Sequence, residues 1–113
     1  MPFHFGYCAL SAKTRIYDIG IRRHLARIDR KYHPLVRAEI EQALLYEPLR
    51  EARNRKPLAR PAMLGSTWEL RCGPANCFRI FYRPYRGSRE VHILAIGIKN
   101  RSRLIVGGEE YSL

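Results

Sequence analysis

The side chains best placed for chemistry lie in residues 66–82, STWELRCGPANCFRIFY. Glu69, Arg71 and Arg79 occupy alternate positions there, and alternation with period two is typical of a half-buried β-strand. Arginines on a rigid sheet present the kind of surface that a phosphate backbone meets. The same three side chains can instead neutralise one another in structural ion pairs.

Turn residues at 73–76 interrupt this alternation and predict a β-hairpin. A pairing shifted by one residue would bury Glu69 and Arg71, so burial should set the register. We expect one face of the hairpin to be charged and the other to enter the core. The core-facing residues are Trp68, Leu70, Phe78, Ile80 and Tyr82.

The chain has 113 residues and a formal net charge of +11, which indicates one small, strongly basic domain. Such a charge favours a nucleic-acid partner, because Lys and Arg release counterions from phosphate polymers. An acidic protein partner and solubility alone remain open as explanations. The sequence has no apolar run of membrane-spanning length, and its start is a poor secretion signal. We therefore expect no membrane contact and a cytoplasmic location.

The cysteines Cys8, Cys72 and Cys77 are odd in number. Cys72 and Cys77 flank the predicted turn, so a disulfide between facing strands remains open. Without a matching His or Cys cluster this pair is a poor zinc site. Buried, reduced thiols are favoured, and we expect no metal and no other cofactor.

Helical periodicity follows a first strand expected over residues 13–19. A helix is expected over 21–31 and a second over 35–46, separated by a proline break. His24 lies beside the first apolar stripe and is interpreted as a structural histidine. Because the link is short, the helices should form an antiparallel hairpin. The stripe of the first helix consists of Ile21, Leu25 and Ile28.

Cations dominate the remaining connections. Residues 49–63 form a basic connector, which is either a solvated loop or a nucleic-acid contact. Residues 91–98 are almost entirely apolar, which is typical of a strand buried on both faces. A second basic cluster follows, where loops leave the rigid sheet, and then a short strand up to Gly107-Gly108. The cations singled out here are Arg53, Arg55, Lys56, Lys99, Arg101 and Arg103.

The expected element order is β-α-α-β-β-β. This order predicts an α+β fold in which the two-helix hairpin covers one face of a three- to four-stranded antiparallel sheet. Residues 13–113 form the domain. Residues 1–12 are either a flexible extension or pack on the sheet edge.

Taken in order, these segments resemble the RelE/ParE superfamily of bacterial type II toxins. The resemblance covers residues 13–113 and depends on the ordered set, since no single motif is decisive. Its parts are a strand, a helical hairpin ending near Glu47-Pro48, and the segments NRKPL (54–58), WELR (68–71), FRIFY (78–82) and LAIGIKNR (94–101).

The resemblance implies one of two activities. RelE-like members enter the ribosomal A site and cleave mRNA there, whereas ParE-like members inhibit DNA gyrase and cleave nothing. Both kinds are neutralised by a cognate antitoxin, and toxin and antitoxin together bind operator DNA. The implied partners are therefore an antitoxin and either the ribosome with its mRNA or DNA gyrase.

RNA cleavage by 2′-hydroxyl attack needs a base, a cation at the phosphate and an acid. The resemblance gives phosphate stabilisation to Arg79 and places Lys99 as the second cation. Thr67 and Glu69 stand where RelE-like enzymes carry lysines, and Ile105 stands where a catalytic tyrosine is expected. The usual base and acid are therefore not reproduced.

Other titrating residues offer substitutes. Glu69 could serve as the base, as a carboxylate does in some relatives, or could form an ion pair with Arg71 or Arg79. Tyr82 and His92 could handle protons, but strand alternation places both toward the core. The expected nucleic-acid contacts are Arg53, Arg55, Lys56, Arg71, Arg101 and Arg103.

The leading hypothesis is a metal-independent, ribosome-dependent endoribonuclease that acts as the toxin of a toxin–antitoxin pair. The alternative is a ParE-like gyrase inhibitor without catalysis, which the incomplete acid–base set favours. A third hypothesis is an inactive relative that binds only RNA or an acidic antitoxin.

Overall fold

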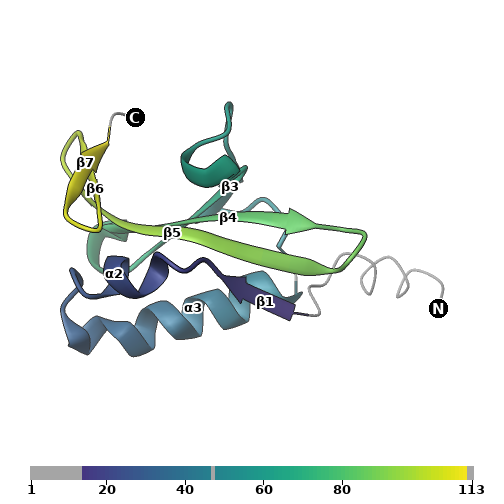
Figure 1. The fold of residues 1–113 in the computed structure, drawn as a ribbon, viewed down its shortest axis with the longest axis horizontal. Coiled ribbons are helices and arrows are strands. Elements are labelled where there is room, and N and C mark those ends of the chain that lie inside the picture. Colours follow the sequence, from purple (N-terminus) through teal and green to yellow (C-terminus); the bar gives the residue numbers. More distant parts are fainter. Residues whose placement is uncertain (1–13, 47, 112–113) are drawn as a thin grey trace.

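The computed structural model describes residues 14–46 and 48–111, and the extension expected over residues 1–12 lies outside them. The helices are α2 (Ile21–Leu25) and α3 (His33–Tyr46), with short 3-10 segments η1 (Arg30–Tyr32), η2 (Met63–Gly65) and η3 (Pro74–Asn76). The strands are β1 (Thr14–Tyr17), β2 (Arg55–Pro57), β3 (Trp68–Cys72), β4 (Phe78–Tyr85), β5 (Glu90–Asn100), β6 (Arg103–Val106) and β7 (Glu109–Tyr111). Figure 1 shows both helices on the same side of the long β4–β5 ribbon.

Within the described residues the strands form one seven-stranded sheet in the order β2-β3-β4-β5-β6-β7, with β1 also paired to β5. The expected three- to four-stranded sheet is therefore wrong. The basic connector contributes β2, and the tail continues past the expected short strand into a β6–β7 hairpin. Gly107 and Gly108 form the turn of that hairpin, with φ of 60° and 89°, a conformation that glycine adopts without steric cost.

The expected two-helix antiparallel hairpin, and with it the order β-α-α-β-β-β, is also wrong. The first helix ends after only five residues, because the backbone bonds tighten there to an i→i+3 pattern, from Arg27 N–H to the His24 carbonyl and from Ile28 N–H to the Leu25 carbonyl. Asp29 then leaves the helical region (φ −52°, ψ 133°) and accepts a hydrogen bond from the Lys31 N–H, starting η1. Short acidic side chains compete with helical hydrogen bonds in this way. His33 Nε2 bonds the carbonyls of Leu25 and Ile28, at 2.9 Å each. Consequently α3 is the main helix.

The hairpin expected over residues 66–82 is confirmed, with β3 paired antiparallel to β4. Leu70 lies opposite Ile80 and Arg71 opposite Arg79, so the charged side chains share one face. Gly73 is required at the turn: its φ is 81°, and a Cβ there would collide with the ring of Phe78.

Strand β5 is central and buried on both sides, as expected. The main core lies between the sheet and the helices. A smaller apolar cluster covers the opposite face and explains why β5 is apolar throughout. The members of this second cluster are Phe81, Ala95, Leu104 and Val106, packed by Leu58, Ala62, Met63 and Tyr111.

The pairing of β1 with β5 is parallel and joins two segments that lie far apart in the sequence. β4 occupies one edge of β5, so β1 and β6 share the other edge. Pairing with β1 extends along β5 as far as Ile93, and pairing with β6 starts at Gly97 of β5. Residues 94–96 of β5 therefore lie between the two strands.

Candidate functional site

The sheet face opposite the helices carries the charged residues of the β3–β4 hairpin, and we call it the charged face. Period-two alternation puts Glu69 and Arg71 of β3 on this face. Arg79 of β4 joins them because it lies directly opposite Arg71. The three side chains are therefore brought together as the sequence pattern predicted.

Glu69 lies between the two guanidinium groups. Its Oε1 accepts from Arg71 Nε at 3.0 Å, and its Oε2 accepts from Arg79 Nη1 at 3.3 Å. Glu69 is 5% exposed and Arg79 9%, so this is a buried ion pair. Removing one partner of such a pair typically costs about 3–5 kcal/mol, because an uncompensated charge remains.

Arg79 is also held from the turn, where its Nε donates to the carbonyl of Asn76 at 3.1 Å. Asn76 and Ala75 both adopt positive φ, 54° and 52°, which is unusual for residues with a Cβ. The tight 3-10 turn η3 therefore aims a carbonyl at the guanidinium. Glu69 and the turn together set the direction of Arg79.

Lys99 extends the charged face onto β5. Gly97 lies opposite Arg79, and Lys99 is two residues further on the same face, a diagonal separation of about 7–8 Å between Cα atoms. A Cβ at Gly97 would approach Leu104 Cδ1 and Val106 Cγ2 to 2.9 Å, so glycine lets β6 lie close here. Lys99 is half-buried, and no ion pair or side-chain hydrogen bond joins it to the rest of the described chain.

The other predicted nucleic-acid contacts separate into two groups. Lys56 lies opposite Glu69 and is exposed on the charged face, while Arg53 and Arg101 are exposed in turns. Arg55 projects to the helical side instead, where its Nη1 donates to the Ala43 carbonyl at 2.7 Å and holds α3. Arg103 forms an exposed ion pair with Glu110 at 3.0 Å.

Tyr82 is in the core, as strand alternation predicted. It is fully buried, its hydroxyl donates to the Pro48 carbonyl at 2.8 Å, and burial raises its pKa strongly. His92 does not face the core. It is half-buried on the β4–β5 hairpin, where its Nε2 lies 3.0 Å from Glu90 Oε1.

Two cysteines lie within the described residues, and the buried one offers little reactivity. Cys72 and Cys77 are both free thiols, so the disulfide that the sequence left open is not formed. Burial raises the pKa of Cys72 to about 12, which keeps it protonated and inert.

Residues 14–46 and 48–111 contain no group of three His, Cys, Asp or Glu side chains that could hold a metal ion. The helices of this part of the chain are also too short or too polar to cross a membrane.

Comparison with known proteins supports the fold. The chain is similar to a chain of the toxin–antitoxin complex RelBE2 from Mycobacterium tuberculosis, with 27% identity, 80% of this chain and 93% of that chain covered, and a TM-score of 0.55. The resemblance to the RelE/ParE superfamily is confirmed. No protein-family model and no curated protein matches the sequence.

A tyrosine that sequence analysis missed lies on the charged face of this RelE/ParE-like fold. Tyr111 of β7 is opposite Leu104, which is opposite Lys99. It is half-buried against the second apolar cluster. Ile105, where a tyrosine was expected, points to the other side of the sheet. The Gly107-Gly108 pair is the sequence signal for a hairpin turn, and a strand predicted after it would have placed Tyr111 beside β6.

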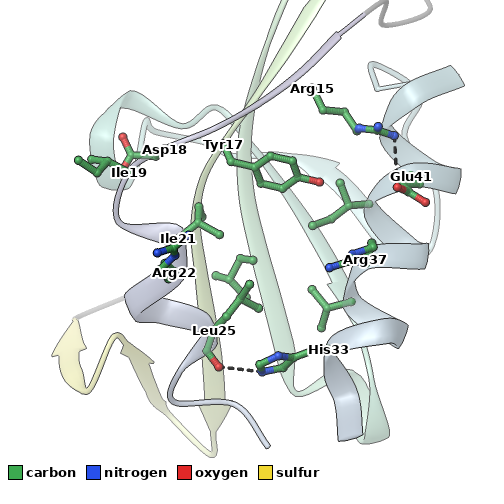
Figure 2. Close-up of a pocket in the computed structure, with 13 residues that line it drawn as sticks. Arg15, Tyr17, Asp18, Ile19, Ile21, Arg22, Leu25, His33, Arg37 and Glu41 are labelled. Atoms are coloured by element: carbon green, nitrogen blue, oxygen red, sulfur yellow. Dashed lines mark hydrogen bonds and ion pairs between the residues drawn. The ribbon is translucent and has the colours of Figure 1, made fainter. Parts of the chain in front are cut away.

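A groove of about 800 Å³ lies on the helical side of the RelE/ParE-like fold, between β1, α2 and α3. Figure 2 shows Tyr17, Ile21 and Leu25 along one wall and Arg37 and Glu41 on α3 along the other. Arg15 Nη1 lies 3.6 Å from Glu41 Oε2 across the groove. Ile19, at one end of the groove, is 95% exposed. An apolar groove edged by charged side chains, here Arg15, Arg37 and Glu41, is typical of a peptide-binding surface.

Proposed function

We propose that this chain is the toxin of a type II toxin–antitoxin pair and that it inhibits translation by cutting ribosome-bound mRNA. The observation that carries the proposal is the charged face, where Arg71 and Arg79 surround Glu69 and Lys99 lies diagonally across β5. Similarity to a chain of a toxin–antitoxin complex supports the toxin assignment. The net charge of +11 suits a target walled by ribosomal RNA.

The reaction we assign is attack of a ribose 2′-hydroxyl on the adjacent phosphate. The 2′ oxygen loses its proton and bonds to phosphorus, the bond from phosphorus to the 5′ oxygen breaks, and the 5′ oxygen takes up a proton. Arg79 and Lys99 stabilise the negative charge that concentrates on the phosphate oxygens. A guanidinium held at Nε by Asn76 can grip a phosphate through its remaining N–H groups.

Glu69 acts as the base in this proposal, once substrate has arrived. In the free protein both of its carboxylate oxygens are occupied by arginines. A substrate phosphate competes for the same guanidinium groups, and their shift toward it releases the carboxylate to accept the 2′ proton. Tyr111 is the proposed acid, because its phenol shares the charged face with Lys99.

Surrounding cations hold the RNA backbone. Arg53, Lys56 and Arg101 are exposed and free to contact phosphates. Arg55 and Arg103 contribute less, since the first holds the Ala43 carbonyl and the second is paired with Glu110.

The antitoxin partner is assigned to the groove. Its apolar floor suits the hydrophobic side of an amphipathic segment, and its arginine-bearing rim suits acidic residues of a segment that folds on binding.

Ile19→Ser should weaken antitoxin binding by about tenfold or more and leave mRNA cleavage unchanged. Unchanged antitoxin affinity, measured by titration calorimetry, would move the partner to another surface. Operator DNA is expected to bind only the toxin–antitoxin complex.

The decisive experiment adds purified protein to ribosomes stalled on a defined mRNA and maps new 5′ ends by primer extension. Cuts confined to the A-site codon and absent without ribosomes are expected. Arg79→Ala and Lys99→Ala should each lower the cleavage rate by about 100-fold or more. Arg30→Ala removes the same charge from an exposed position on η1 and should cleave normally.

Gyrase inhibition is the second candidate, and the engaged state of Glu69 favours it, since both oxygens of this proposed base are already paired with arginines. Intact mRNA from a preparation that still arrests growth would select it, and loss of DNA supercoiling by gyrase would then be measured. Growth unaffected by expression without antitoxin would indicate the inactive relative instead.

A further inference from the structure

The far end of the β4–β5 hairpin carries an aromatic and cationic cluster that the proposed cleavage does not use. Tyr85 is 40% exposed, and its ring centroid lies 4.6 Å from that of His92 with the planes tilted by 56°. The Arg83 guanidinium carbon lies 5.2 Å from the Tyr85 centroid, within cation–π range. Glu90 bonds His92 at 3.0 Å and fixes the imidazole.

This cluster lies on the same side of β4 as the proposed active site. Alternation along β4 puts Arg79, Phe81, Arg83 and Tyr85 on one face, and cross-strand pairing brings His92 opposite Arg83. Six residues of strand place Tyr85 about 20 Å from Arg79. That is the length of about six stacked nucleotides at 3.4 Å each.

A loop separates the two sites, so the cluster is a distinct contact. Leu58, Ala62 and Met63 pack against the second apolar cluster, to which Phe81, midway along β4, belongs. Arg83 Nη1 lies 3.4 Å from the carbonyl of Gly65 at the end of that loop, which ties the loop to the cluster. Leu64 beside it is largely exposed. An exposed leucine and a partly exposed tyrosine ring therefore lie near the Arg83 cation.

The chemistry of this surface matches unpaired bases. Exposed aromatic rings bind single strands by stacking, while neighbouring arginines follow the backbone. Arg86 lies in the exposed turn that closes the hairpin. A duplex keeps its bases stacked inside, so it offers Tyr85 no face to stack on.

We propose that Tyr85, backed by His92 and Arg83, is a base-stacking platform for single-stranded RNA. An incoming base takes the open part of the Tyr85 ring, and the Arg83 guanidinium moves to the adjoining phosphate. The inference rests on the proposed function in taking RNA as the ligand, and it adds a second point of contact. Anchoring a strand at both points would fix which phosphate reaches Arg79.

The test uses a single-stranded RNA 12-mer containing 2-aminopurine, whose fluorescence is quenched by stacking, and no ribosomes. Tyr85→Leu keeps apolar bulk but removes the ring, and it should weaken binding about 5- to 100-fold. The slope of log affinity against log salt should not change, because no charge is lost. Tyr85→Phe is the matched control and should bind as the wild type does.

Equal affinity and equal quenching for Tyr85→Leu and wild type would overturn the platform, as would wild-type protein that does not bind the 12-mer at low salt. The midpoint of thermal unfolding is measured for both variants. A midpoint equal to that of the wild type shows that a loss of binding is not caused by misfolding. Because A-site cleavage is scored separately, loss of the platform and loss of the proposed cleavage are distinguishable. An active nuclease that binds RNA equally well without the Tyr85 ring contradicts only the platform.

Discussion

His24 Nδ1 accepts a hydrogen bond from the Ile96 backbone N–H at 3.2 Å. The imidazole thereby satisfies a donor of β5 in the interval where neither β1 nor β6 is paired with it. The interpretation of His24 as a structural histidine is confirmed by this contact. Because Nδ1 accepts, the proton of the neutral ring is on Nε2.

Stability should fall as the solution is acidified through the titration of His24. Burial, with a further effect from Arg23, lowers the pKa of His24 below its ordinary value, so the unfolded chain binds the proton more readily. The stabilisation is complete above about pH 6.5 and is lost as the pH falls through the lower folded pKa. Urea unfolding at pH 7.5 and 5.5 measures the difference.

His24→Asn is the matched control, because an amide oxygen can accept the Ile96 hydrogen bond but does not titrate. Its stability should depend less on pH over this range than that of the wild type. An identical pH dependence in the two proteins would assign the effect to other groups.

Glu69→Gln separates the two roles of this side chain. If the carboxylate accepts the 2′ proton, A-site cleavage should fall by about 10²–10⁴-fold. Affinity for single-stranded RNA should be retained or rise, since a negative charge leaves the charged face. Cleavage within tenfold of the wild-type rate would restrict Glu69 to holding Arg71 and Arg79.

Arg101→Gly should raise stability and lower RNA affinity together. Arg101 adopts a φ of 60° in the two-residue turn between β5 and β6, and glycine relieves this strain by up to about 1 kcal/mol. Loss of one phosphate contact should reduce the salt slope of RNA binding by about one unit. A variant that is destabilised, or whose salt slope is unchanged, contradicts the respective half of this prediction.

Tyr82→Phe should reduce the free energy of unfolding by about 1–2 kcal/mol, because the buried Pro48 carbonyl loses its hydrogen bond. Cleavage per folded molecule should stay at the wild-type level, since the hydroxyl points away from the charged face. A large loss of cleavage with unchanged stability would return Tyr82 to the active site.

Local pattern predicted the parts of the fold that are made of neighbouring residues. The β3–β4 hairpin follows from period-two alternation and its turn, and β5 from an apolar run. The parallel pairing of β1 with β5 joins residues about 76 positions apart, as Thr14 and Glu90 show, and periodicity carries no information about such partners. The early end of α2 depends on i→i+3 backbone bonds after Leu25 and on the turn at Asp29, local contacts that override a helical stripe.

The sequence predicted where the candidate site lies in the fold, but not which of its charged side chains form ion pairs or hydrogen bonds. Alternation placed Glu69, Arg71 and Arg79 on one face, yet the sequence left open whether Glu69 was paired. Arg55 resembles its neighbour Lys56 in charge, and only strand register sends it to α3 instead of the charged face. Tyr111 was missed because β7 exists only through its pairing with β6.

The groove shown in Figure 2 has a consequence for biosynthesis. Its walls come from β1, α2 and α3, but Ile96 of β5 belongs to its lining. A ribosome must therefore deliver the chain beyond Ile96 before the groove can assemble. A partner that docks there would recognise chains in which β5 has already paired with β1, and it would not bind shorter nascent chains.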